Sequence, residues 1–345
     1  VAGIVAARAD NNLGVAGLAH GCRVMNLRAF NSSGYGEEDD VASAILYAIA
    51  NGARVVNMSF GDVFVSRILD DVIQYGYAQG VVMVSSAGNS STDAIHYPSG
   101  FAETISVGAT DDNDERAAFA NFGSTLDLVA PGSFVLSTTL RQDYHNWSGT
   151  SFSAPYVAAA AALVLSQQPD LDVDAVRAAL VNTADDLGDP GWDATFAAGR
   201  LNVQRVLRHD AGTLAQISTP RLDAGFSKAP ITVSGSAWSP DFDVYRLYYG
   251  QGDNPDDWIP ISQDIATPVI EGPLFTWNEL PQQEGEYTLR LEVVNRDGST
   301  AVHHTRFFLD WSPPVISNVE LLPMLDADRH SVLVQFETDD LCEGS

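Results

Sequence analysis

Short apolar runs alternate with amphipathic segments in the first part of the chain. Arg23–Ala29, Arg54–Met58 and Val81–Val84 are short and apolar, which predicts buried strands. The segments between them, Glu37–Ala50 and Val65–Gln79, have helical spacing, and each is followed by a glycine. Strands that alternate with helices in this way indicate a parallel sheet covered by helices on both faces.

The same pattern continues to about residue 207. Short strands are predicted near Thr104–Val107 and Asp127–Val129, and an alanine-rich helix is predicted to begin at Ser151. Two further helices are expected at Val173–Thr183 and Leu201–Leu207. In a sheet of this kind, ligands bind at the carboxyl ends of the strands, so the loops that follow the strands are expected to share one cleft.

The hydrophobic period changes from helical to alternating after about residue 211. The alternating segments are Ile231–Val233, Val244–Tyr249, Tyr287–Val294 and Val302–Leu309. They predict an antiparallel β-sandwich of immunoglobulin or fibronectin type, whose core Trp238, Trp258 and Trp277 would fill. The overall fold class is therefore α/β with a three-layer parallel sheet, followed by an all-β sandwich.

Three domains are predicted from these changes in pattern. Residues 1–210 form the α/β domain, and residues 211–310 form the sandwich. Residues 311–345 contain a proline-rich linker and the start of a further β domain that the chain does not complete. The first residues, Val1 to Ala9, are expected to be the remainder of a buried helix, so we interpret the chain as a fragment of a longer protein.

The amino-acid composition argues against binding to nucleic acid or to membranes. The chain has 45 acidic and 18 basic residues, a formal net charge of −27, and a surface of this charge repels nucleic acid and anionic membranes. No run of 18 apolar residues suggests a membrane span. Neither nucleic acid nor a membrane is therefore an expected partner.

One stretch, Ser148–Pro155, carries candidate chemistry. A turn of small residues places Ser151 at the start of a helix, where free backbone N–H groups favour negative charge. A serine held there can attack a carbonyl group while its own N–H faces the resulting oxyanion. The alternative from these residues alone is a loop serine that caps a core helix. An α/β-hydrolase elbow is excluded because Ser153 stands where that motif needs glycine.

Four stretches together resemble the subtilisin-like serine peptidases, or subtilases. They are Asn57–Gly61, Ser85–Asn89, Ala130–Gly132 and Gly149–Pro155, and the opening VAGIVAA is similar to the helix after that family's catalytic histidine. The resemblance covers about residues 1–207. It implies that Ser151 is the nucleophile of a serine endopeptidase that works through an acyl-enzyme, and that Asn89 donates to the oxyanion.

The resemblance also implies how an extended polypeptide substrate would bind. Gly34, Tyr35 and Gly36 match one backbone segment that pairs with the substrate, and Ser59, Phe60 and Gly61 match the other. Ser86, Ala87 and Gly88 match one wall of the pocket for the residue before the scissile bond. His96 matches the pocket floor, where it would narrow the pocket or favour an acidic or polar residue; the alternative is a solvent-facing loop histidine.

The family's catalytic aspartate and histidine would precede Val1, and none of the seven histidines in the chain fits as the base. We therefore expect the 345-residue chain to be inactive and its full-length parent to be a secreted or cell-surface endopeptidase. The alternative is a degenerate peptidase that serves as a binding or adhesion module. Intact Ser151 and Asn89 favour the enzyme.

No cofactor is required for this chemistry, but a structural calcium ion is implied by the family resemblance. The loop Asp10–Gly14 is similar to a calcium loop of the family, and Asn11 would offer a side-chain oxygen, which suits a hard cation. The alternative is a polar loop that ends a helix.

Overall fold

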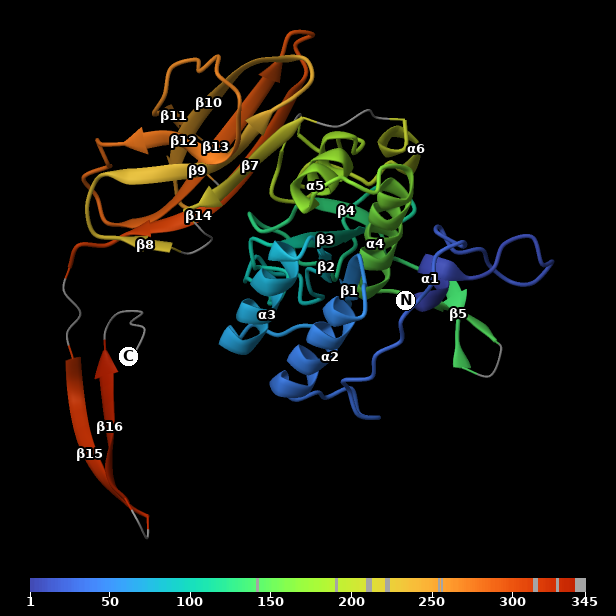
Figure 1. The fold of residues 1–345 in the computed structure, drawn as a ribbon, viewed down its shortest axis with the longest axis horizontal. Coiled ribbons are helices and arrows are strands. Elements are labelled where there is room, and N and C mark those ends of the chain that lie inside the picture. Colours follow the sequence, from blue (N-terminus) through green and yellow to red (C-terminus); the bar gives the residue numbers. More distant parts are fainter. Residues whose placement is uncertain are drawn as a thin grey trace.

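A computed structural model of the chain, drawn in Figure 1, describes residues 1–140, 143–189, 192–208, 213–220, 224–253, 255, 257–312, 316–326 and 329–338. At residues 271, 316–326 and 329–338 it describes the backbone alone. An α/β domain comes first along the chain and an antiparallel β-rich domain follows it (Figure 1). The predicted fold class is therefore confirmed.

The α/β domain is built on a parallel sheet with the order β1-β2-β3-β4. Its strands are β1 (Val55–Met58), β2 (Val82–Ser86), β3 (Thr104–Thr110) and β4 (Leu128–Pro131). Alternate side chains of β2 point to opposite faces, and both faces are covered. Val82 and Val84 pack with the helix that starts near Ser151, whereas Met83 packs with the helices on the other side. A strand buried on both faces needs apolar residues at every position, which explains the continuous apolar run.

Helices form the two outer layers. They are α1 (Ala2–Ala6), α2 (Glu38–Ala50), α3 (Arg67–Ala78), α4 (Thr150–Gln167), α5 (Val173–Asn182) and α6 (Val203–Val206). The cluster around α2 and α3 covers one face of the sheet, and the cluster around α4 and α5 covers the other. The alanines of α4 are buried on several sides of the helix, which is typical of a central helix.

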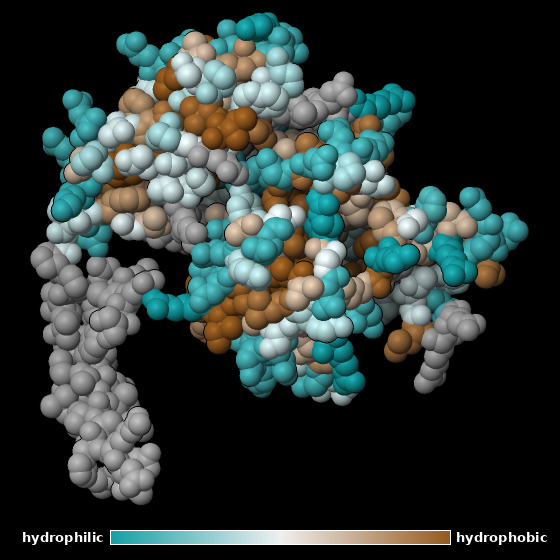
Figure 2. Space-filling view, viewed as in Figure 1, coloured by the Kyte–Doolittle hydropathy of each residue, from teal (hydrophilic) through white to brown (hydrophobic). Residues whose placement is uncertain are grey.

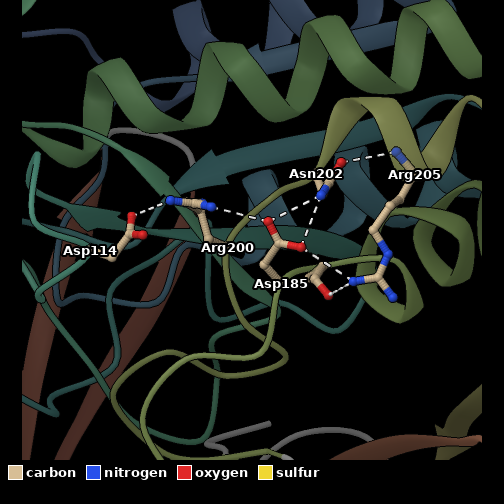
Figure 3. A network of polar contacts seen from close by, with 6 residues as sticks. Asp114, Asp185, Arg200, Asn202 and Arg205 are labelled. Atoms are coloured by element: carbon tan, nitrogen blue, oxygen red, sulfur yellow. Dashed lines mark hydrogen bonds and ion pairs between the residues drawn. The ribbon is translucent and has the colours of Figure 1, made fainter.

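A polar network fixes the chain that follows α5 against the edge of the sheet (Figure 3). Arg200 pairs with Asp114 and, at 3.1 Å, with Asp185. Asp185 also accepts hydrogen bonds from Asn202 at 2.9 and 3.1 Å. The hydrogen bonds from Asn202 and then from the arginines hold the pKa of Asp185 below its usual value. The backbone around Arg200 bonds to Val129 of β4, so the network extends the sheet's outer edge.

Two hydrogen-bonded sheets, antiparallel except for one strand pair, make up the second domain. One has the order β11-β10-β13-β14-β8 and the other the order β12-β9-β7. Their strands are β7 (Leu214–Thr219), β8 (Ala224–Phe226), β9 (Ile231–Trp238), β10 (Phe242–Gln251), β11 (Ile259–Pro260), β12 (Val269–Trp277), β13 (Gly285–Asn295) and β14 (Thr300–Leu309). Strand β8 joins β14 in parallel, and the other pairs are antiparallel. Residues of both sheets share one hydrophobic cluster, as expected for a sandwich.

Two of the three tryptophans expected in that core are not part of it. Trp277 is buried in the cluster, but Trp238 and Trp258 are only partly buried and lie outside it. The ring of Trp258 instead lies 5.2 Å from that of His304 and under the guanidinium of Arg290. An aromatic residue can thus gain its packing from another ring and a cation as well as from the hydrophobic core.

The strand predicted at Arg23–Ala29 is wrong. This segment has no strand partner among the described residues, and Val24 and Met25 are 51% and 40% exposed. Apolar alternation creates a strand only where a neighbour supplies a ladder. Two hairpins were not predicted in detail: β5 (Val135–Thr138) with β6 (Tyr144–Trp147), and β15 (Ile316–Asp326) with β16 (Arg329–Thr338).

The described residues include no helix long and apolar enough to cross a membrane. Hydrophilic residues cover much of the face shown in Figure 2, in agreement with the large net charge. The domain boundaries proposed above stay predictions, and Pro313 and Pro314 of the predicted linker lie outside the described residues.

Candidate active site

Ser151 is the second residue of α4, and its position follows from the residues on either side. Gly149 precedes the helix with φ 148°, a conformation that side chains rarely adopt. Pro155 has no N–H, so it cannot donate to the carbonyl four residues earlier, which belongs to Ser151. The hydroxyl of Ser59 donates to that carbonyl instead, at 2.9 Å. A proline inside the helix thus creates the acceptor that joins α4 to the loop after β1.

The loop after β1 and the start of α4 are joined in both directions. The Ser151 hydroxyl donates to the carbonyl of Ser59 at 3.4 Å, and Asn57 donates to the Ser59 hydroxyl at 2.9 Å. Asn57 lies in β1, so this chain of contacts runs from the sheet to Ser151. The structure therefore holds Ser59 against the candidate nucleophile; that the stretch Ser59–Gly61 pairs with a substrate stays a prediction.

The side chain of Asn89 also reaches the start of α4. Its Oδ1 accepts from the backbone N–H of Thr150 at 2.8 Å and from the Thr150 hydroxyl at 3.0 Å. These contacts use the oxygen of the amide and leave its Nδ2 donors directed elsewhere. The amide lies beside Gly149 and so next to Ser151 in the chain. An asparagine oriented in this way can donate to an oxygen that sits near the serine.

Two residues that orient this loop were missed in the sequence. Thr150 fixes the amide of Asn89, and its hydroxyl also contacts the carbonyl of Gly88 at 3.3 Å. Asn121 donates to the carbonyl of Ala87 at 3.0 Å and accepts from the N–H of Ser90 at 2.8 Å. Thr150 lies inside a quoted motif, but Asn121 is more than 30 residues from its partners, and no local pattern indicates it.

His96 lies against the loops that follow β1 and β2, and its role as a pocket floor stays a prediction. A Cβ atom on Gly61 would overlap the imidazole ring, and one on Gly88 would lie 3.2 Å from its Cγ. Burial lowers the pKa of His96 below 6.5, although Asp62 and the carbonyls of Ser86 and Gly61 favour the charged form. The ring is therefore neutral at pH 7, and it is half-buried rather than solvent-facing.

The remaining predicted substrate segment is the loop that contains Gly34, Tyr35 and Gly36. The side chain of Asn31 accepts from the N–H of Tyr35 at 3.1 Å and closes the turn, and Tyr35 itself is 77% exposed. This loop does not follow a strand, contrary to the prediction. It is connected to the site through Phe30, whose ring lies 5.0 Å from that of Phe60.

No histidine whose side chain the structure describes is hydrogen-bonded to Ser151. His20 is exposed and His145 lies on β6, with its ring beside Trp147. His303 and His304 belong to the β domain, and His209 and His330 fall outside the described side chains. Among the described side chains, the site thus contains a candidate nucleophile and a candidate oxyanion donor but no histidine placed as a base.

The calcium prediction remains a prediction. Asn11 uses its Oδ1 to accept from the N–H of Leu13 at 3.0 Å, which leaves one lone pair for an ion. Among the residues that the structure describes, no group of three or more histidine, cysteine or acidic side chains could hold a metal. Calcium takes six to eight oxygen ligands, so this loop alone does not make a complete site.

Comparisons with known proteins agree with the fold and the motifs. The model of the subtilase family matches residues 1–199. Subtilisin DY of Bacillus licheniformis is 41% identical over 208 residues, 59% of this chain and 74% of that protein. Thermitase of Thermoactinomyces vulgaris is 36% identical over 208 residues, 60% of this chain and 73% of that protein. A solved structure, the prenylagaramide maturation protease PagA, is similar with a TM-score of 0.55 and 28% identity, over 60% of this chain and 79% of that one. The chain belongs to the subtilase family of serine peptidases.

Proposed function

We propose that Ser151 is the nucleophile of a serine endopeptidase and that Asn89 is its oxyanion donor. The observation that carries the proposal is the contact between Asn89 and Thr150, which occupies the amide oxygen at the helix start and leaves the amide N–H groups available as donors beside Ser151. Ser151 Oγ would attack the peptide carbonyl carbon while its proton passes to a base. The C–N bond of the resulting intermediate then breaks, the amine leaves with that proton, and water hydrolyses the acyl-enzyme.

The substrate is an extended polypeptide that lies between the loop Gly34–Gly36 and the stretch Ser59–Gly61. Backbone hydrogen bonds to such segments recognise any extended chain. The residue before the scissile bond enters the space bounded by Ser86–Gly88, with His96 at its floor. Because His96 is neutral and wedged against Gly61, we expect it to shorten the pocket and to favour a small or polar residue over a large apolar one.

The 345-residue chain by itself is expected to react slowly, because none of its described histidines contacts Ser151. Without a base the serine hydroxyl stays protonated and is a weak nucleophile. We also propose that the protein acts outside the cell or at its surface, which the β domain after the peptidase domain and the acidic composition support. Detection of the intact protein in the medium or at the surface of producing cells tests the location.

Labelling with a fluorophosphonate probe tests the site. We expect slow labelling of the chain that is accelerated by added imidazole, which acts as an external base, and abolished in Ser151→Ala. Asn89→Ala should slow the imidazole-dependent reaction; for a subtilisin, loss of the corresponding donor costs about 10²–10³-fold. Rapid stoichiometric labelling without imidazole would show that a base is present. Equal labelling of Ser151→Ala would show that another residue is the nucleophile.

A further inference from the structure

A cleft of about 500 Å³ lies between the peptidase domain and the β domain. One wall is apolar apart from Asp93 and comes from two loops of the peptidase domain, the one after β1 and the one after β2. The other wall is charged and comes from β13, β14 and the turn after β10. The lining residues are Val63, Val65, Asp93, Ala94, Ile95, Tyr97, Asp253, Glu286 and Arg306. A volume of this size is within the range of ligand-binding clefts.

The apolar wall is exposed to an unusual degree. Val63, Phe64 and Val65 are consecutive in the chain and are 55%, 76% and 59% exposed. Soluble proteins rarely expose a run of apolar residues unless it binds something. The helix α3 follows this loop. On the face shown in Figure 2, hydrophobic residues also reach the surface over α2 and α3.

The cleft adjoins the proposed substrate pocket. The backbones of Asp62 and Tyr97 exchange hydrogen bonds of 2.9 and 2.7 Å, which join the two loops of the apolar wall. His96 lies next to this pair and against Gly61. His96 and this backbone pair therefore separate the proposed pocket from the cleft, so the cleft can be reached only by substrate residues that lie outside the pocket.

The charged side chains of the cleft indicate which kind of polypeptide would bind there. Arg306 lies 3.1 Å from Glu286 and 3.5 Å from Asp253, so a single guanidinium faces two carboxylates. Asp93 on the opposite wall is exposed and adds a third carboxylate. The excess of negative charge favours a cation, and the net charge of −27 disfavours both a second copy of this chain and an anionic membrane.

We propose that this cleft binds a segment of the polypeptide substrate that carries basic and apolar side chains, outside the pocket at His96. The apolar side chains pack on Val63 and Val65, and the basic ones pair with Asp93 and Glu286. The β domain thereby becomes part of substrate recognition. This inference rests on the proposed peptidase function in one respect, namely that the bound polypeptide is the substrate of the enzyme.

Peptide binding to the intact 345-residue chain tests the proposal without catalysis. A fluorescent peptide that alternates lysine and leucine is titrated by anisotropy, together with one in which glutamate replaces lysine and one in which serine replaces leucine. We expect the lysine–leucine peptide to bind at least about tenfold more tightly than the glutamate peptide, and salt to weaken its binding. Equal affinity for the two would overturn the proposal.

Variants then locate the binding. The double change Glu286→Gln with Asp93→Asn should lower the affinity for the lysine–leucine peptide about tenfold, and Val65→Ser should lower it about fivefold. The matched control Asp39→Asn with Asp170→Asn removes the same charge at exposed sites elsewhere and should change affinity less than twofold. Circular dichroism checks that each variant is folded. If the control weakens binding as much as the cleft variant, binding reflects net charge and the cleft is not the site.

Failure of this proposal and failure of the peptidase function give different results. Ser151→Ala should bind the peptide like the wild type, since it does not touch the cleft. If the peptide binds as expected but labelling does not depend on Ser151, the cleft proposal stands and the assignment of Ser151 as nucleophile is wrong. If labelling depends on Ser151 but the three peptides bind equally well, the cleft proposal is wrong and the assignment of Ser151 as nucleophile stands.

Discussion

His303 gives the most quantitative prediction about stability. It lies on β14, where the β domain meets α5, and lines a partly open cavity that Arg177 also lines. Its Nδ1 accepts from the N–H of Ile217 at 3.3 Å, which requires the neutral ring. Burial, and then the positive charge of Arg177, lower the pKa of His303 from 6.5 to about 3. The acidic groups around the same cavity are Asp127 and Asp174; Asp127 already pairs with Arg177.

The sign and size of the pH effect follow from this shift. The unfolded chain takes up a proton at His303 below about pH 6.5, whereas the folded chain resists protonation down to about pH 3. The stability contributed by the neutral ring is thus fully present above pH 6.5 and decreases as the pH falls. At about pH 5 the loss is about 2 kcal/mol, and it would approach about 5 kcal/mol near pH 3.

Chemical unfolding of wild type and His303→Asn at about pH 7.5 and pH 5 measures this difference. The asparagine oxygen can still accept from Ile217, so the variant removes the titration and keeps the hydrogen bond. We expect the wild type to lose about 2 kcal/mol more than the variant on acidification. His145→Asn, at an exposed histidine, should behave like the wild type. Identical losses for wild type and His303→Asn would refute the assignment.

Three further variants test the packing around the site and the sheet edge. Asp185→Asn removes a carboxylate that two arginines and an asparagine contact, and should lower the free energy of unfolding by about 1.5–3 kcal/mol at pH 7, measured by denaturant titration. Gly132→Ala places a Cβ atom onto Ser153 Oγ and should destabilise the protein by about 1–3 kcal/mol, seen as a lower Tm. Ser59→Ala leaves the carbonyl of Ser151 without its donor and should cost about 1–3 kcal/mol while slowing probe labelling; an unchanged labelling rate would show that the contact does not position the serine.

The fold of the first domain could be predicted because its strands are buried on both faces. Val81–Val84 is apolar at every position, and in the structure its successive residues pack against different helical layers. Arg23–Ala29, in which apolar residues are interspersed with polar ones, was also predicted as a strand, but it has no partner among the described strands. The hydrophobic pattern records which segments can be strands, whereas pairing depends on segments that are distant in sequence.

The candidate site could be predicted only where its residues lie within a local motif. Ser151, Gly149 and Pro155 fall in one stretch, and their roles follow from helix geometry. Asn121 and Thr150 orient the loop around Asn89 through hydrogen bonds to residues 31 to 62 positions away. Such contacts use ordinary polar side chains, and nothing in the spacing of the sequence distinguishes them from surface residues.

The contact between the two domains explains why the aromatic core was partly mispredicted. The ring of His304 lies 4.4 Å from Trp192 of the peptidase domain and 5.2 Å from Trp258 of the β domain. Hydrogen bonds from Ser124 to Asp253 and from Asn182 to Thr213 join the same two domains. Alternation along a strand indicates that one face is apolar, but it does not say whether a second sheet or another domain covers that face. Because His304 packs on Trp192 and two hydrogen bonds cross the same contact, the β domain is expected to lose stability when it is separated from the peptidase domain.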